Sequence, residues 1–138
     1  MTRLLVVEDD DDFSETLAEI FQAAGYSVKQ ANNGHKGLHL CRQWRPHIVV
    51  TDLIMPEMEG ITLIRELTND ASHPTIIAIS GGGEHPLPEH DDMVDSYLES
   101  ARLLGASLAY AKPVDFCRLL RDVTALTSES NSFNAQAG

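Results

Sequence analysis

The sequence predicts a doubly wound α/β fold, in which a five-stranded parallel sheet carries five helices distributed over both of its faces. Short apolar runs without polar alternation recur along the chain, and such runs are typical of strands that are buried on both faces. Between them lie segments whose apolar residues are spaced three and four apart, as in amphipathic helices. The resulting order βαβαβαβαβα implies right-handed crossovers, which place helices on both faces of the sheet.

Five segments are expected to form the strands. Four of them are apolar runs. The remaining one is weaker, but it follows Gly25, a residue that can end the preceding helix in the left-handed conformation. In chain order, the expected strands are LLVV at 4–7, YSVKQ at 26–30, HIVV at 47–50, TIIAI at 75–79 and SLAYA at 107–111.

Five further segments are expected to form the helices. The acids Asp10 to Asp12 precede the first of them, and acidic residues stabilise the positively polarised N-terminus of a helix. In chain order, the apolar positions that define the helices are Phe13, Leu17, Ile20, Phe21 and Ala24; Leu38 and Cys41; Leu63, Ile64 and Leu67; Val94, Tyr97, Leu98, Ala101 and Leu104; and Phe116, Leu119, Leu120, Val123 and Leu126.

Length and composition narrow the class of protein. A chain of 138 residues with 43% hydrophobic and 22% charged residues is typical of one globular domain. Its 21 acidic and 10 basic residues give a net charge of -11, which disfavours binding to nucleic acid. The apolar start of the chain stops at Glu8, so it is too short for a signal peptide or a membrane span. We therefore expect a cytoplasmic protein without a nucleic-acid or membrane partner.

The domain is expected to cover residues 1–127. The segment 128–138 is polar, small and aperiodic, which predicts a flexible tail. Cys41 and Cys117 fall among apolar helix positions and lack CxxC spacing. We expect both to be buried, reduced thiols.

Polar residues follow four of the five expected strands. Glu8 and Asp9 end the first, Asp52 the third, Ser80 the fourth and Lys112 the fifth. In open parallel sheets, ligands bind beyond the carboxyl ends of the strands, so these side chains are expected to converge. Carboxylate oxygens are ligands of hard divalent cations such as Mg²⁺. A carboxylate beside such a cation can accept a phosphoryl group, whose oxygens an ammonium and a hydroxyl can bind.

Four motifs carry a resemblance to a known family. They are VVEDD at 6–10, VVTDLIMPEMEG at 49–60, IIAISGG at 76–82 and YAKP at 110–113. Together, and in this order, they resemble the response-regulator receiver domains of two-component signalling. The resemblance extends over about residues 2–127 and implies the flavodoxin-like receiver fold, in a stand-alone receiver.

The resemblance also implies roles for the residues at the strand ends. Asp52 would accept a phosphoryl group from a histidine kinase or a phosphotransfer protein, and Lys112 and Ser80 would be the phosphate-binding lysine and the switch hydroxyl. Mg²⁺, with Mn²⁺ as an alternative, would be bound directly by Asp9 and Asp52, through water by Glu8, and by the backbone carbonyl of Ile54.

By the same resemblance, the protein would not be an enzyme beyond catalysing its own phosphorylation and dephosphorylation. An unidentified downstream protein would bind to the surface formed by the helix at 93–104, the strand at 107–111 and the helix at 116–126.

The sequence departs from the family pattern at two places. Ala109 stands where the family usually carries an aromatic residue, and Tyr110 is expected on the opposite face of the strand. The 31 residues between Ser80 and Lys112 exceed the family's usual spacing, and the excess falls in a loop over Gly81 to Glu89. We expect this loop, with the residues up to Asp92, to move in place of the aromatic residue.

Four alternatives stay open. The chain could be a non-phosphorylated scaffold with the receiver fold. It could be a Mg²⁺-dependent phosphohydrolase with an aspartyl-phosphate intermediate, although such enzymes commonly carry a second Asp where this chain has Ile54. His35 and His39 could bind a metal or lie on a solvated helix face. The segment His85 to Asp92 could form a second site or a solvated loop.

Overall fold

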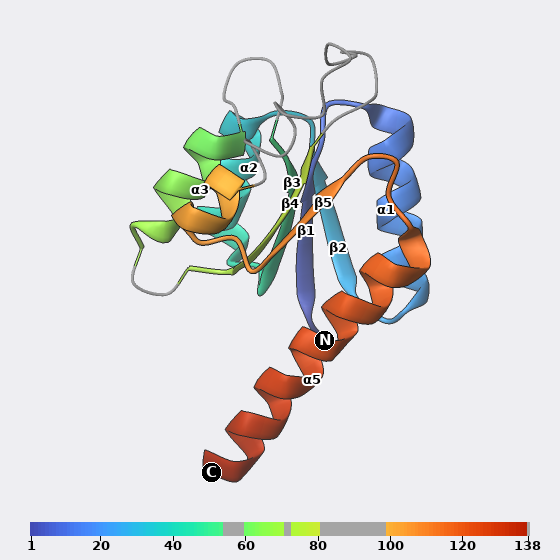
Figure 1. The fold of residues 1–138 in the computed structure, drawn as a ribbon, viewed down its shortest axis with the longest axis vertical. Coiled ribbons are helices and arrows are strands. Elements are labelled where there is room, and N and C mark those ends of the chain that lie inside the picture. The colour runs from blue at the N-terminus through green and yellow to red at the C-terminus, as the bar shows by residue number, and fades with distance from the viewer. Residues whose placement is uncertain (54–59, 71–72, 81–98, 138) are drawn as a thin grey trace.

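The computed structural model describes residues 1–53, 60–70, 73–80 and 99–137 (Figure 1). Within these ranges, five strands form a single parallel sheet in the order β2-β1-β3-β4-β5. This order requires crossovers between neighbouring strands, and it confirms the predicted fold class. The strands are β1 (Arg3–Val7), β2 (Ser27–Ala31), β3 (Ile48–Asp52), β4 (Thr75–Ser80) and β5 (Leu108–Ala111).

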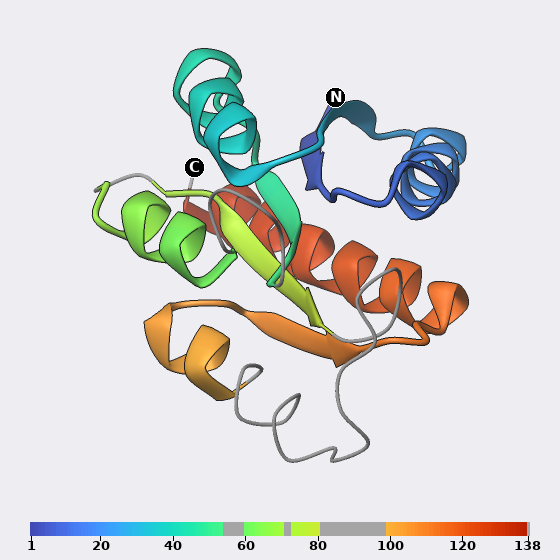
Figure 2. The same ribbon diagram turned by 90° about the horizontal axis from the view of Figure 1, so that it is seen from above.

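Helices cover both faces of the sheet, as Figure 2 shows from above. The helices α1 (Asp11–Ala23) and α5 (Phe116–Ala137) lie on one face, and α2 (Gly34–Trp44) and α3 (Gly60–Thr68) lie on the other. Residues 99–104 are also helical and lie on the side of α3. They form the described end of the helix expected at 93–104, whose earlier part lies outside the described residues.

The core has two halves, one on each face of the sheet. Successive residues of a strand point to opposite faces, and Leu4 and Val6 accordingly join one half while Leu5 and Val7 join the other. The half below α1 and α5 contains Leu17, Phe21, Leu119 and Val123, and the half below α2 and α3 contains Leu38, Cys41, Leu63, Ile64 and Leu67. The apolar strands lack polar alternation because, as predicted, both of their faces are buried.

The acids at the start of α1 behave as predicted. Asp10 is the N-cap residue, and its Oδ1 accepts hydrogen bonds from the backbone N–H groups of Asp12 and Phe13 at 3.1 and 3.2 Å. Asp11 and Asp12 lie in the first helical turn, where the helix dipole favours negative charge. At the other end, Gly25 has φ +99°, the left-handed conformation that its sequence position predicted.

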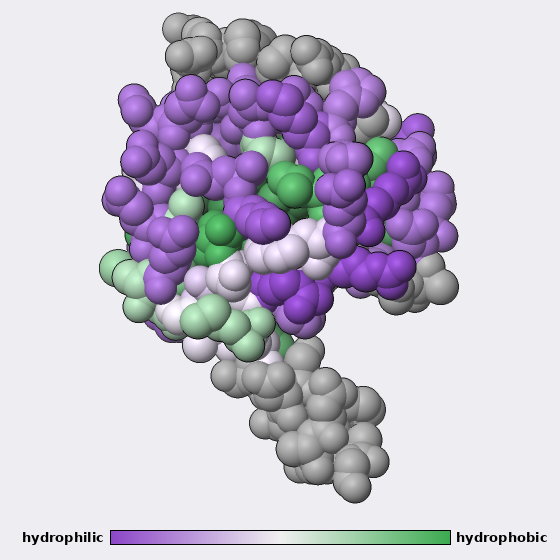
Figure 3. Space-filling model, turned by 180° about the vertical axis from the view of Figure 1, so that it is seen from behind, coloured by the Kyte–Doolittle hydropathy of each residue, from purple (hydrophilic) through white to green (hydrophobic). Residues whose placement is uncertain are grey.

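The side of the sheet opposite the viewer in Figure 1 carries the edge strand β2, between α1 and α2. Figure 3 shows that the surface of this side is mostly hydrophilic, with small hydrophobic patches between polar side chains. Lys29 and Gln30 of β2 are exposed, which explains why this strand gave the weakest pattern in the sequence.

Helix α5 does not end where the sequence suggested. It continues to Ala137 over 22 residues, and its last part projects beyond the rest of the domain (Figure 1). Residues 128–137 contain neither Pro nor Gly, so nothing in them interrupts a helix that has already formed. The flexibility of this segment stays a prediction. No helix in the described ranges is both long enough and apolar enough to span a membrane.

The expectation for the cysteines is half wrong. Cys41 is buried in the core below α2, but Cys117 is exposed. The apolar face of α5 is formed by Leu119 and Val123, and Cys117, two residues before Leu119, lies off this face.

Candidate functional site

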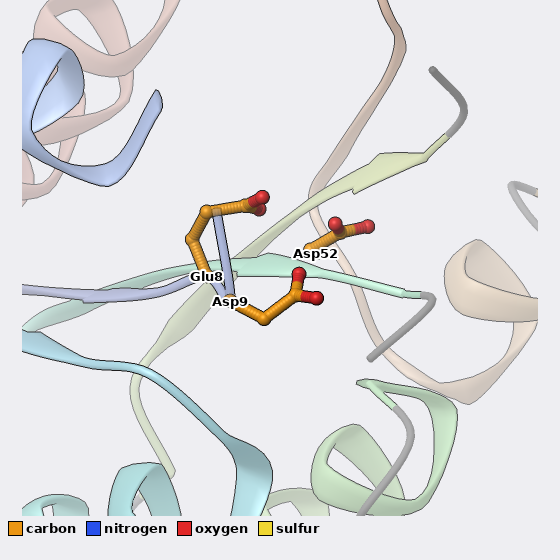
Figure 4. Close-up of side chains that lie close together, drawn as sticks. All are labelled: Glu8, Asp9 and Asp52. Carbon is orange, nitrogen blue, oxygen red and sulfur yellow. The ribbon is translucent and has the colours of Figure 1, made fainter. Parts of the chain in front are cut away.

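The residues predicted at the strand ends converge in the structure. Glu8 and Asp9 follow β1, Asp52 ends β3, Ser80 ends β4 and Lys112 follows β5. One carboxylate oxygen from each of the three acids lies within 4.8 Å of the others, and Figure 4 shows Glu8, Asp9 and Asp52 gathered at this edge of the sheet. A set of close carboxylate oxygens fits a hard divalent cation such as Mg²⁺.

Lys112 links two of these acids. Its Nζ donates a hydrogen bond to Oε1 of Glu8 at 3.1 Å and another to Oδ2 of Asp52 at 3.3 Å. The side chains are 9% exposed for Lys112, 2% for Glu8 and 7% for Asp52. An ion pair so well shielded is little weakened by salt, and breaking it by removing one partner is costly.

The electrostatics of the site favour added positive charge. Burial, followed by the negative charge of Asp52, raises the pKa of Glu8 from 4.5 to about 8, even though the Lys112 ammonium acts in the opposite direction. Burial lowers the pKa of Lys112, but the charges of Asp52 and Glu8 outweigh burial, so its pKa lies above that of an ordinary lysine. A cation among the acids would act in the same direction as the Lys112 ammonium and favour the ionised form of the Glu8 carboxyl.

Ser80 provides an unused hydroxyl beside this cluster. Its Oγ is buried and has no hydrogen-bond partner in the described part of the chain, although a buried hydroxyl ordinarily has one. The backbone of Ser80 fixes its neighbour across the sheet, because its carbonyl accepts a hydrogen bond from the N–H of Lys112 at 2.8 Å. The hydroxyl and the ammonium therefore come from neighbouring positions at the carboxyl ends of β4 and β5.

The backbone of Asp52 is held by its surroundings. The Thr51 hydroxyl donates a hydrogen bond to the carbonyl of Asp52 at 2.9 Å. Gly60 lies against the same carbonyl, so closely that a Cβ atom would overlap it. The motif that runs from Asp52 to Gly60 therefore brings the start of α3 back onto the end of β3. Ile54, the expected carbonyl ligand, lies outside the described residues.

Ala109 and Tyr110, where the sequence departs from the family pattern, lie on different faces of the sheet. Ala109 packs against the core half below α2 and α3, and Tyr110 packs against the half below α1 and α5. The Tyr110 hydroxyl donates a hydrogen bond of 2.6 Å to Oδ2 of Asp122 on α5. The prediction that Tyr110 points away from the usual aromatic position is confirmed. The expected moving segment, Gly81 to Asp92, lies outside the described residues.

The histidine pair on α2 does not form a three-ligand site. His35 and His39 line a pocket of about 570 Å³ together with Glu8 and Asp11. In the described ranges, however, the only three residues of a metal-ligating type whose donor atoms all lie within 4.8 Å of one another are Glu8, Asp9 and Asp52. Both histidines are exposed, which fits the alternative of a solvated helix face. The second alternative site, at His85 to Asp92, lies outside the described residues.

Phe13 lies next to the site, although the sequence pattern predicted only that it belongs to the core. Its ring centroid lies 4.4 Å from Nζ of Lys112. The helical spacing of Phe13 predicted that it faces inward, but no pattern along the sequence indicated that it meets a lysine 99 positions later.

Comparison with known proteins agrees with this geometry. The sequence matches the response regulator receiver domain family over residues 4–124. It is 31% identical over 126 residues to protein PilH of Pseudomonas aeruginosa, a match that covers 91% of this chain and 98% of that protein. It is 35% identical over 120 residues to response regulator receiver protein Anae109_2439 of Anaeromyxobacter sp., covering 87% of this chain and 46% of that protein.

Some relatives are therefore much longer, and the chain spans 24% of the regulatory protein AtoC of Escherichia coli, to which it is 30% identical. Among solved structures, the N-terminal domain of an uncharacterized protein (WS1339) from Wolinella succinogenes superposes with a TM-score of 0.81 at 26% identity, covering 96% of this chain and 98% of that one. From its sequence match and its fold, the chain belongs to the response regulator receiver domain family.

Proposed function

We propose that this chain is the phosphoacceptor of a two-component or phosphorelay system, and that Asp52 receives the phosphoryl group. The donor would be a phosphohistidine on a histidine kinase or a phosphotransfer protein. One observation carries the proposal: Asp52 lies among two further acids, the Lys112 ammonium and the unpartnered Ser80 hydroxyl, at one edge of the sheet. Phosphoryl transfer needs a nucleophile together with positive charge and donors for the phosphoryl oxygens.

In the proposed reaction, an Asp52 carboxylate oxygen forms a bond to phosphorus while the bond between phosphorus and the donor histidine nitrogen breaks. The product is an acyl phosphate on Asp52 and an unphosphorylated histidine, and water later hydrolyses the acyl phosphate. Lys112 would then exchange its contact with the Asp52 carboxylate for one with a phosphoryl oxygen. The Ser80 hydroxyl would donate a hydrogen bond to a second phosphoryl oxygen, which would give this buried hydroxyl a partner.

The acids would serve as the metal site of this reaction. Mg²⁺, or Mn²⁺ in its place, would be held directly by Asp9 and Asp52, through water by Glu8, and by the carbonyl of Ile54. When bound, the cation supplies positive charge that neutralises the phosphoryl oxygens. Two observations support the assignment: the three close carboxylate oxygens, and the raised pKa of Glu8, which burial and the charge of Asp52 cause and which a cation would lower.

The chain would act as a signalling protein that catalyses only its own phosphorylation and dephosphorylation. A downstream protein would recognise the surface made by the helix that ends at residue 104, by β5 and by α5. Lys112 follows β5 directly, so a change at the phosphoryl group can reach this surface through one strand. Because such a donor works in the cytoplasm, we place the chain there.

The test is labelling with acetyl phosphate, followed by mapping of the adduct by mass spectrometry. We expect one Mg²⁺-dependent phosphoryl group on Asp52, and none in Asp52→Asn. Asp115→Asn is the matched control, because Asp115 is an exposed acid whose Oδ1 accepts a hydrogen bond from the N–H of Arg118, and an amide oxygen can replace it. Undiminished labelling of Asp52→Asn would contradict the assignment. A phosphotransfer profile against the histidine kinases of the host would then identify the donor.

A further inference from the structure

We infer that Phe13 is a positioning residue for Lys112, and that its ring holds the Lys112 ammonium where a phosphoryl group on Asp52 would need it. The inference rests on the proposed function and deepens it, because it adds an aromatic residue to a site otherwise built from charges. Nζ of Lys112 lies 4.4 Å from the centroid of the Phe13 ring. A cation within about 6 Å of a ring centroid is attracted by the negative face of the ring.

The Lys112 ammonium is contacted by two kinds of neighbour. Glu8 and Asp52 accept its hydrogen bonds at 3.1 and 3.3 Å, and the Phe13 ring approaches the same nitrogen. Only 9% of the Lys112 side chain is exposed, so little water competes with the ring. Attraction between a cation and an aromatic ring is stronger when the pair is desolvated, and this pair is well shielded.

The Phe13 ring is itself fixed by a second ring. Its centroid lies 5.8 Å from that of Phe116, and the two ring planes are tilted by 40°. Phe13 belongs to the start of α1 and Phe116 is the first residue of α5. Both pack against the core half below these helices. The ring beneath Lys112 is therefore packed against residues of two helices, in addition to its contact with the lysine.

A fixed ring prepares the lysine for binding. A lysine side chain loses much rotamer freedom when its ammonium is held in one place. When Phe13 restricts Lys112 before the phosphoryl group arrives, less of this loss remains to oppose binding. A leucine at position 13 would fill part of the same volume but would offer no negative face to the ammonium.

The first experiment measures the affinity for beryllofluoride, a phosphoryl mimic, by calorimetry in excess Mg²⁺. We expect Phe13→Leu to weaken binding about fivefold, which corresponds to ~1 kcal/mol, and Phe13→Tyr to bind like the wild type because it keeps the ring face. Phe116→Leu is the matched packing control, since it removes the other ring of the pair and leaves the ring beside Lys112. Equal losses of affinity in Phe13→Leu and Phe116→Leu would overturn the inference.

A double-mutant cycle with Lys112 separates positioning from packing. In the Lys112→Met background, Phe13→Leu is expected to have no further effect on beryllofluoride affinity, because the cation that the ring holds is gone. A fivefold loss in both backgrounds would show that Phe13 acts without Lys112, and would overturn the inference.

A spectroscopic measurement tests the contact without phosphorylation. In the metal-free protein, the ring current of Phe13 should shift the NMR signals of the Lys112 ε-methylene protons upfield, in the wild type and in Phe13→Tyr but not in Phe13→Leu. No upfield shift in the wild type would contradict the role of Phe13. If the wild type shows the expected upfield shift but does not bind beryllofluoride, the proposed function is contradicted instead. The two failures are therefore distinguishable.

Discussion

Gly60, the first residue of α3, lies directly against the backbone of Asp52. A Cβ atom at Gly60 would overlap the carbonyl oxygen of Asp52 and would lie 2.6 Å from the Cα atom of Leu53. The N–H of Gly60 also donates a hydrogen bond to the carbonyl of Leu53 at 3.0 Å. The start of α3 and the end of β3 therefore fix each other, and with them the backbone that carries the Asp52 carboxylate.

The first prediction is that Gly60→Ala lowers the free energy of unfolding by ~1–3 kcal/mol or more, ~1–3 kcal/mol being the usual cost of overpacking. The loss is expected because the new methyl group would overlap backbone atoms, and only a shift of the backbone could make room for it. Urea unfolding measures the loss, and acetyl phosphate labelling measures the displacement of Asp52. Gly37→Ala is the comparison, since its Cβ would lie 2.8 Å from Cγ2 of Val7 and so would crowd a side chain rather than the backbone. Equal losses in the two variants would contradict the proposed rigidity.

The second prediction concerns pH. In the folded, metal-free protein, burial and the charge of Asp52 raise the pKa of Glu8 from 4.5 to about 8. Between these two values, the folded state keeps a proton that the unfolded state has released, so the contribution of Glu8 to stability falls as pH rises.

Urea unfolding in chelator over this pH range should therefore show a steeper fall for the wild type than for Glu8→Gln. Saturating Mg²⁺ should reduce the difference, since a cation favours the ionised carboxylate. Parallel curves for the two proteins in chelator would show that Glu8 does not titrate in this window.

The third prediction concerns metal removal. The carboxylate oxygens of Asp9 and Asp52 lie within 4.8 Å of each other, and two like charges at this separation repel by ~1 kcal/mol even in water. In chelator, Asp9→Asn should raise the unfolding midpoint by about 3–5 °C, while its gain in stability from Mg²⁺ should be smaller than that of the wild type. Differential scanning calorimetry measures both effects, with Asp115→Asn as a control away from the cluster. A lower midpoint for Asp9→Asn in chelator would contradict repulsion.

The fourth prediction is that the hydroxyl of Tyr110 stabilises the contact between β5 and α5. It donates a 2.6 Å hydrogen bond to Asp122, and burial together with this bond raises the pKa of Tyr110. Tyr110→Phe should lower the free energy of unfolding by ~1 kcal/mol. Tyr26→Phe is the control, because the Tyr26 hydroxyl reaches Thr127 only at 3.5 Å, and it should cost less. A loss no larger than that of the control would argue against the bond.

The fifth prediction distinguishes the two cysteines. Burial raises the pKa of Cys41 to about 12, whereas Cys117 is exposed. Since the thiolate is the reactive form, iodoacetamide should modify Cys117 in the native protein and Cys41 only after unfolding. Mass spectrometry of digested protein identifies the modified residue, and Cys117→Ser should remain unmodified until it unfolds. Native labelling of Cys41 would contradict its burial.

The sequence was informative where burial imposes a simple period. Strands buried on both faces produced continuous apolar runs, and the topology that they imply was enough to predict that Asp52 and Lys112 meet. The contact of Phe13 with Lys112 could not be predicted, because it depends on how α1 packs beside a strand end far away in the chain. The exposure of Cys117 was missed for a related reason: one apolar residue in an amphipathic helix can lie on either face.

The prediction for the end of α5 failed for a different reason. Small polar residues predict poor burial, and the residues after Thr127 give no apolar period. A helix that is already formed nevertheless extends at little cost per residue, because only its first turn is expensive to form. Composition therefore could not predict that the helix continues to Ala137.

The two-sided core also determines how substitutions in β1 should combine. Val6 and Val7 are neighbours in the chain but belong to different core halves, and the sheet backbone separates their side chains. Substitutions within one half share a cavity and should interact, whereas a change at Val6 and a change at Val7 should have nearly additive effects on stability. The sheet acts as a partition, so one half of the core can vary in sequence without compensating changes in the other.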